Sequence, residues 1–165
     1  MNQDLINYAF AGEDFSKPYT LAEAATFFHG RNILNLGELA EQAISKKIKI
    51  GQQTRNKEGS DLLDGTEIKY SIVQFYTSST YATIGNVKNK TGTIRAWVYE
   101  ERTKKNHYFL IPYSVYSQYF EGGKKSTMKV WFDSKGKPRT PKFNTNPNLW
   151  ECRVTKQKFF SFKQK

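Results

Sequence analysis

Cysteine, histidine and long hydrophobic runs are all scarce in this sequence. Its one cysteine, Cys152, excludes an internal disulfide, and with only His29 and His107 beside it there is no cysteine and histidine set for a structural zinc ion. No hydrophobic stretch approaches the length of a membrane span, and residues 1–15 lack the basic start and apolar segment of an export signal. We therefore expect a cytoplasmic protein that does not associate with a membrane.

Acidic residues are also few relative to basic ones. Lysine and arginine number 26 against 15 aspartate and glutamate residues, which gives a net charge of +11 and an isoelectric point near 9.6. This excess is typical of proteins that bind polyanions, although ribosomal, membrane-surface and merely soluble basic proteins share it. Nucleic acid is the favoured partner, and 165 residues are enough for one domain with its own core.

Residues 59–71 combine a turn with charged groups. The dipeptide Asp64-Gly65 is a tight-turn signal with hydrophobic residues on both sides, which predicts two short strands joined by a turn. On the second strand Glu67 and Lys69 are two residues apart, so both point to one face, because side chains alternate along a strand. This segment is the candidate catalytic segment of the chain.

Asp61 completes the set. Two carboxylates provide the hard oxygen ligands that Mg²⁺ prefers, and an ammonium group beside them can act on the attacking water and the scissile phosphate. We therefore predict that Asp61, Glu67 and Lys69 are catalytic residues of a metal-dependent phosphodiester hydrolase. Asp61 and Glu67 hold the metal, the backbone carbonyl of Ile68 is a further candidate ligand, and Lys69 orients the water or helps to deprotonate it.

The same residues also fit a surface hairpin whose outward face is charged, and the length of the loop decides between the two interpretations. A two-residue loop, Asp64-Gly65, puts Asp61 on the face opposite Glu67, and Asp64 is then the alternative metal ligand. A three-residue loop that includes Thr66 gathers Asp61 with the other charged groups. The catalytic interpretation therefore requires an odd loop or a bulge.

Two helices are predicted before this segment. A capping box at Thr20 predicts a helix over 21–29, and a second one at Asn35 predicts a helix to about residue 47. Glu41 lies at the edge of the apolar stripe of the second helix. Two short helices in a basic protein also resemble a helix-turn-helix. Covering of a sheet, or a dimer contact, fits them better, because the outer face of the second helix has few groups that favour phosphates.

The remaining pattern predicts an α/β domain with a central mixed β-sheet flanked by helices. The predicted strands are 47–51, 66–75, 127–132 and 149–154, together with a hairpin of 92–100 and 106–111. A short helix over 113–120 follows Pro112. The chain continues into a basic tail at 156–165, whose phenylalanines are expected to pack on the core.

Two polar segments are the candidate DNA-binding loops. Residues 76–83 are rich in hydroxyl groups, and residues 135–148 form a long connection with prolines, basic residues and asparagines. Such groups hydrogen-bond to base edges and phosphates, although polar surface loops share the composition. The predicted DNA-contacting residues are Tyr76, Thr77, Ser78, Ser79, Thr80, Tyr81, Lys135, Lys137, Arg139, Lys142, Asn144, Asn146 and Asn148.

An aspartate followed by Glu-x-Lys, here Asp61 and residues 67–69, resembles the motif of the PD-(D/E)xK nuclease superfamily, with Ser60 in place of the usual proline. Over about the last two-thirds of the chain, the residue order resembles type II restriction endonucleases of the PvuII type. The chain departs from that type by a shorter turn before Glu67 and by residues 77–80, where the family has a histidine-rich segment. The similar segments are 58–61, 67–69, 94–99, 110–112, 119–120 and 146–147.

This resemblance implies a type II restriction endonuclease of a restriction-modification system: a homodimer that uses Mg²⁺ to cut both strands of double-stranded DNA at a specific sequence, leaving 5′-phosphate and 3′-hydroxyl ends. It also offers Glu41 as a helical glutamate at the rim of the metal site, although an ordinary boundary glutamate fits as well. The alternatives are a homing, repair or phage nuclease with the same core, and a non-catalytic helix-turn-helix DNA-binding protein.

We expect a single nuclease domain over 1–165, with a helical flanking and dimerisation part at 1–50 and a catalytic and DNA-recognition core at 51–165. Several N-terminal hydrophobic residues exceed what one amphipathic face requires, which suggests a dimer interface. These residues are Phe27, Phe28, Ile33 and Leu34.

Overall fold

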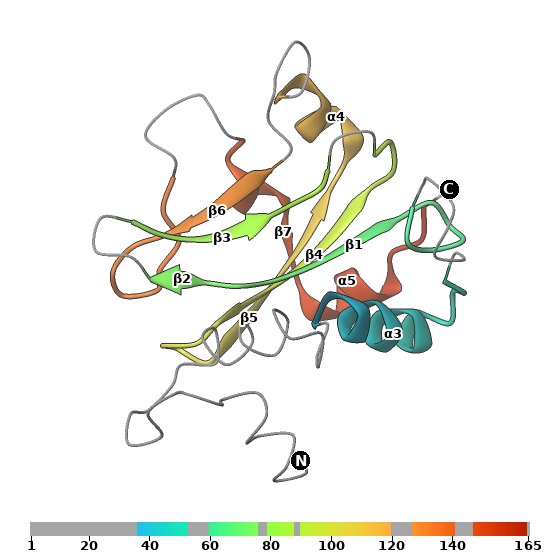
Figure 1. Ribbon diagram of the computed structural model, residues 1–165, viewed down its shortest axis with the longest axis horizontal. Helices are drawn as coiled ribbons and strands as arrows, with labels where there is room; N and C mark the ends of the chain where they lie inside the picture. Colours follow the sequence, from blue (N-terminus) through green and yellow to red (C-terminus); the bar gives the residue numbers. More distant parts are fainter. Residues whose placement is uncertain are drawn as a thin grey trace, which may run out of the picture.

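The computed structural model describes residues 36–52, 60–75, 79–87, 90–119, 127–140 and 147–164. The described chain forms two β-sheets and three short helices (Figure 1). The predicted α/β class with a mixed central sheet is confirmed. The helices are α3 (Leu36–Ile48), α4 (Tyr113–Tyr116) and α5 (Lys156–Ser161), with 3-10 segments η1 (Ser117–Tyr119) and η2 (Leu149–Cys152).

The central sheet has four strands in the order β1-β4-β5-β7, and β1 is parallel to β4 while the other pairs are antiparallel. The second sheet is antiparallel, with the order β2-β3-β6. The central strands are β1 (Glu67–Ile72), β4 (Ile94–Glu100), β5 (Lys105–Ile111) and β7 (Arg153–Val154). Those of the second sheet are β2 (Gln74–Phe75), β3 (Thr80–Ile84) and β6 (Met128–Phe132).

The central sheet lies between two hydrophobic clusters. One face packs against the second sheet, and its cluster includes Ala82, Ile94, Phe109, Val130 and Phe132. The other face packs against α3 and α5, and its cluster includes Ile44, Leu62, Ile68, Leu110 and Phe159. The candidate catalytic residues lie at the start of β1, which is an edge strand of this sheet.

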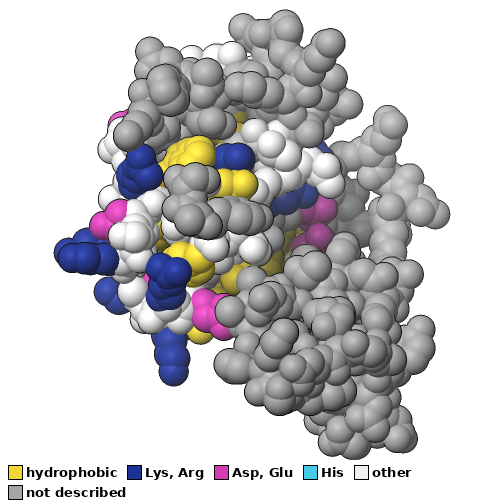
Figure 2. All heavy atoms as spheres, turned by 60° about the vertical axis from the view of Figure 1, so that its left-hand side comes forward, with side chains coloured by type: hydrophobic (Ala, Val, Ile, Leu, Met, Phe, Trp, Pro, Cys, Tyr) yellow, Lys and Arg dark blue, Asp and Glu magenta, His cyan; other side chains and the backbone are white. Residues whose placement is uncertain are grey.

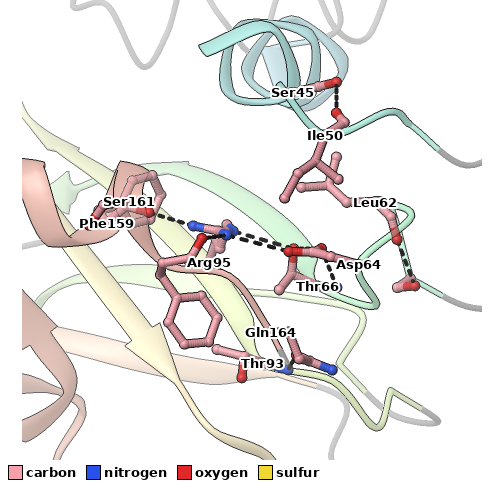
Figure 3. Close-up of polar contacts among 12 residues, drawn as sticks. Ser45, Ile50, Leu62, Asp64, Thr66, Thr93, Arg95, Phe159, Ser161 and Gln164 are labelled. Carbon is pink, nitrogen blue, oxygen red and sulfur yellow. Dashed lines mark hydrogen bonds and ion pairs between the residues drawn. The ribbon is translucent and has the colours of Figure 1, made fainter. Parts of the chain in front are cut away.

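Helix α3 covers the sheet with a stripe of Ala40, Ile44 and Ile48, which are spaced four residues apart and buried. The predicted strand over 47–51 is wrong, because residues 47 and 48 continue the helix. Lys49 has a positive φ of 58° and ends it, and the Ser45 hydroxyl donates to the Ile50 carbonyl at 2.5 Å (Figure 3).

Other predictions of secondary structure are confirmed in part. The β4–β5 hairpin, the helix after Pro112, strand β6 and the packing of Phe159 are as predicted. The strand over 66–75 is divided at Val73 between the two sheets, and residues 80–83 lie in β3 instead of a loop. Residues 149–152 form η2, so only two residues of the predicted last strand pair.

The predicted helix over 21–29 and the residues of the predicted dimer interface lie outside the described residues. The second predicted helix is α3, and its hydrophobic face is used to cover the sheet. No helix in the described part of the chain is long and apolar enough to cross a membrane.

Candidate active site

The candidate active site lies at the start of β1, at the edge of the central sheet. Glu67 is the first residue of this strand, and its backbone N–H donates to the Thr93 carbonyl at 3.0 Å. Its carboxylate is buried, with 2% of the side chain exposed, and contacts the ammonium group of Lys69 through Oε1. The predicted placement of Glu67 and Lys69 on one face of a strand is therefore what the structure contains.

A short turn positions Asp61 beside this strand. The Leu62 N–H donates to the Thr66 carbonyl at 3.1 Å and the Gly65 N–H to the Leu62 carbonyl at 3.0 Å, while Gly65 takes a φ of 82°. The loop between Leu62 and Thr66 has three residues, an odd number as the catalytic interpretation required, but it starts one residue earlier than predicted. The predicted hairpin is wrong, because β1 pairs in parallel with β4 and Leu62 only bridges Gln52.

The Asp61 carboxylate is fixed by the strand itself. Its Oδ2 accepts a hydrogen bond from the Ile68 N–H at 2.7 Å. Burial raises the pKa of Glu67, the hydrogen bond and charge of Lys69 oppose that rise, and the negative charge of Asp61 adds to it. The two carboxylates are therefore close enough for their charges to interact.

Glu41 reaches the same site from helix α3. Burial raises the pKa of its carboxyl group, and the charges of Asp61 and Glu67 raise it further while those of Lys69 and Lys90 lower it. The Glu41 carboxyl group therefore lies within electrostatic range of the three residues found from the motif. A glutamate on the edge of an apolar helical stripe is common, so its position in sequence could not separate this role from that of an ordinary boundary residue.

Lys90 is a functional candidate that the sequence did not reveal. Its ammonium nitrogen lies 2.9 Å from Glu67 Oε2, so the buried carboxylate has one lysine on each oxygen. Lys90 belongs to the connection between β3 and β4, which the parallel pairing of β1 with β4 brings to the start of β1. No local pattern marks it, because lysines in a polar connection are common.

Asp64, the alternative metal ligand, is engaged elsewhere. Its Oδ1 accepts from the N–H and the hydroxyl of Thr66, at 3.1 and 2.7 Å, and its Oδ2 lies 3.6 Å from Arg95 NH2. Arg95 is fully buried and also donates to the carbonyls of Phe159 and Phe162, the second at 2.6 Å. Figure 3 shows this network, which joins the turn to β4 and α5.

Side chains from two other segments hold the residues that precede β4. The Gln164 side-chain oxygen accepts from the Thr93 N–H at 2.7 Å (Figure 3), and the Tyr116 hydroxyl donates to the Gly92 carbonyl at 2.6 Å. Gly92 is so close to the turn that a Cβ atom there would lie 1.9 Å from the Gly65 carbonyl oxygen. These contacts hold the β3–β4 connection against the turn that carries Asp61.

The donor groups suit Mg²⁺ better than a metal that needs a full set of protein ligands. Within the described ranges, no three histidine, cysteine, aspartate or glutamate side chains converge as ligands of one ion. Mg²⁺ is usually bound by one or two carboxylates together with waters and substrate phosphates, which Asp61 and Glu67 can provide. The two ammonium groups on Glu67 already lie where positive charge is stabilised.

The predicted DNA-contacting residues come from segments that adjoin one another in the second sheet. Thr80 pairs with Phe132, so the start of β3 lies beside the loop after β6 that carries the exposed Lys135 and Lys137. Thr80 itself is buried and does not present its hydroxyl to a ligand. Tyr76, Thr77, Ser78, Lys142, Asn144 and Asn146 lie outside the described residues.

Four further predicted contacts are described. Ser79, Tyr81 and Arg139 are partly exposed, and the Asn148 amide donates to Glu151 at 2.9 Å. On the side of the molecule shown in Figure 2, lysine and arginine side chains project around small hydrophobic areas.

Comparison with known proteins gives little at the level of sequence. No protein-family model matches the chain, and no curated protein matches it. Among solved structures, the bacterial homing endonuclease I-Ssp6803I is similar over 71% of this chain and 83% of its own, with 17% sequence identity and a TM-score of 0.39.

Proposed function

We propose that the protein is a Mg²⁺-dependent endonuclease that hydrolyses phosphodiester bonds of double-stranded DNA. The observation that supports this most is the buried Glu67 carboxylate, which lies beside Asp61 and contacts two lysines at the edge of the sheet. Burial of a charged carboxylate is unfavourable unless an opposite charge lies beside it. Where lysine ammonium groups provide that charge, a metal ion can take their place. The net charge of +11 supports a polyanionic substrate.

Each residue has a role that follows from its position. Asp61 and Glu67 would hold the metal, which would supply Lewis-acid chemistry at the phosphate and the attacking water. Lys69, on the same face of β1 as Glu67, orients the attacking water and stabilises negative charge on the phosphate. Glu41 lies at the rim and orders further water. Ile68 holds Asp61 in place through its N–H group.

Within this class we propose a type II restriction endonuclease that acts as a homodimer. The part of the chain that the structure describes has one such site, while both strands of a duplex must be cut. The strands are related by two-fold symmetry, so a symmetric dimer presents an equivalent site to each of them. A homing, repair or phage nuclease uses the same chemistry on another biological target, and the pattern of cleavage separates these possibilities.

The first experiment is digestion of a plasmid of known sequence with Mg²⁺ and with EDTA. We expect cleavage only with Mg²⁺, discrete fragments for a site-specific enzyme, and 5′-phosphate ends when the fragments are mapped. Asp61→Ala and Glu67→Ala should abolish cleavage and keep DNA binding, because they remove metal ligands and reduce repulsion of the phosphates. Glu101→Ala, in the turn between β4 and β5 and at the end of β4 away from Glu67, is the matched control and should cut normally.

Two results would contradict the proposal. Cleavage by either active-site variant at the wild-type rate means that the chemistry lies elsewhere. Specific DNA binding without any cleavage, with Mg²⁺ or Mn²⁺, favours the non-catalytic DNA-binding protein instead. A smear in place of discrete fragments supports an endonuclease but contradicts the more specific proposal of a restriction endonuclease.

A further inference from the structure

Glu67 is unusual in having two ammonium groups from different parts of the chain. Lys69 follows it on β1, whereas Lys90 comes from the connection that leads into β4. Both lysine side chains are about one-fifth exposed, at 20% and 22%, while the carboxylate between them is 2% exposed. A ligand that approaches from solvent therefore meets the two lysines before it meets Glu67.

A metal ion at Glu67 weakens the contact of Lys90 with this carboxylate. Each Glu67 oxygen already has an ammonium group on it, so a cation that binds either oxygen shares its negative charge and repels the ammonium group there. Lys69 is held near the site by its place in the strand. Lys90 lies in a connection outside the strands, so its long side chain is the one with room to turn towards solvent.

The charges of the site indicate what Lys90 then contacts. Glu41, Asp61 and Glu67 are acidic and Lys69 and Lys90 are basic, so the charged set has one net negative charge. A divalent cation converts this to one positive charge, which matches the single negative charge of a phosphodiester. Without Lys90 the loaded site would be neutral and would gain nothing from the approach of a phosphate.

A polar hollow beside Glu67 provides the space. Its volume is about 180 Å³, and Glu67, Lys90 and Gln164 line it together with the backbone of Gly65 and Gly92. That is roughly the volume of six water molecules at ~30 Å³ each, so a phosphodiester group fits. Backbone close to the hollow and a lysine at its wall are features of phosphate sites in proteins.

We propose that Lys90 is a phosphate-binding residue of the cleavage site: it neutralises Glu67 in the free protein and contacts the DNA phosphate at the hollow when a divalent cation takes its place. This inference rests on the proposed function, because it assumes that a metal binds at Asp61 and Glu67. The competing explanation is a purely structural counter-ion, for which the loss of Lys90 lowers stability but leaves the number of phosphate contacts unchanged.

The test is DNA binding measured without cleavage. Fluorescence anisotropy with a labelled duplex is followed over a series of salt concentrations, with Ca²⁺ in place of Mg²⁺ and the duplex checked on a gel for integrity. The variants are Lys90→Gln, Lys90→Arg and the exposed control Lys156→Gln. Melting temperatures show whether each variant is folded.

For Lys90→Gln we expect weaker binding and a slope of log K against log salt that is smaller by about 0.9, the change for one lost phosphate contact. Lys90→Arg should restore the slope, and Lys156→Gln should not alter it. With EDTA in place of Ca²⁺, the wild type and Lys90→Gln should have the same slope, because Lys90 of the wild type then stays on Glu67.

The outcomes separate the two proposals. If the wild type cuts DNA and folded Lys90→Gln keeps the full slope, Lys90 is only a counter-ion and the nuclease stands. If no cation supports cleavage but Lys90→Gln has a smaller slope than the wild type in Ca²⁺ and not in EDTA, Lys90 binds phosphate and the nuclease is refuted. A wild type that does not bind duplex DNA under any of these conditions overturns both.

Discussion

The buried histidine of strand β5 makes a prediction about acid stability that can be worked out in full. His107 is 4% exposed, and its ring packs on Phe132 and Trp150 with ring centres 5.4 and 5.3 Å apart. Neither ring nitrogen has a hydrogen-bond partner among the described residues. Burial, assisted by the charge of Arg153, lowers its pKa from 6.5 to about 4.

A lowered pKa means that the unfolded chain binds a proton more readily than the folded one. Below pH 6.5 the unfolded His107 becomes charged while the folded His107 stays neutral, so stability falls as the pH falls, and the loss is complete at about pH 4. The pKa difference corresponds to a loss of about 3 kcal/mol in the free energy of unfolding. At neutral pH the histidine has no such effect.

The perturbation is His107→Phe, which keeps an aromatic ring between Phe132 and Trp150 and removes the proton. Urea unfolding of both proteins at a series of pH values from neutral to about 4 gives the difference in stability. Protonation of carboxylates at low pH destabilises both proteins equally, so it cancels in the difference between them. The variant should gain about 3 kcal/mol on the wild type over this range. Parallel curves with a constant difference would refute a neutral buried His107.

Two other substitutions test the framework of the site, each with a control. Gly92→Ala should be destabilising and should impair cleavage, because its Cβ meets the Gly65 carbonyl, whereas Gly85→Ala, with its nearest neighbour 3.9 Å away, should be tolerated. Equal melting temperatures for the two would contradict this packing. Arg95→Met should cost about 3–5 kcal/mol in urea unfolding because it leaves buried partners unpaired. Arg102→Met, at an exposed arginine, should lower the free energy of unfolding by only about 1 kcal/mol. A similar loss for both variants would mean that Arg95 is not buried.

The local part of the site could be predicted from the sequence. Alternation along a strand places Glu67 and Lys69 together without knowledge of the rest of the chain, and Asp64-Gly65 marks the turn that returns Asp61 to them. The β4–β5 hairpin was predictable for the same reason, because its two strands are close in sequence and separated by a polar turn.

The missing parts depend on contacts between distant segments. The turn dipeptide Asp64-Gly65 does not predict which strand pairs with β1. The partner is the parallel strand β4, and this pairing brings Lys90 to Glu67. Arg95 alternates with buried residues in β4 and therefore resembles a solvent-facing position, but α5 covers that face and supplies carbonyl partners. A periodic pattern cannot show that both faces of a sheet are covered.

The contacts between the last residues and the site also determine when the site can form during synthesis. The carbonyls that accept from Arg95 come from residues 64 and 67 positions later, and Gln164 follows Thr93 by 71 positions. Contacts this distant in sequence form late in folding. The turn that holds Asp61 therefore lacks its support until residues 159–164 have been made. We expect that chains released before these residues are made lack the proposed cleavage activity, so a cell would be protected from such fragments.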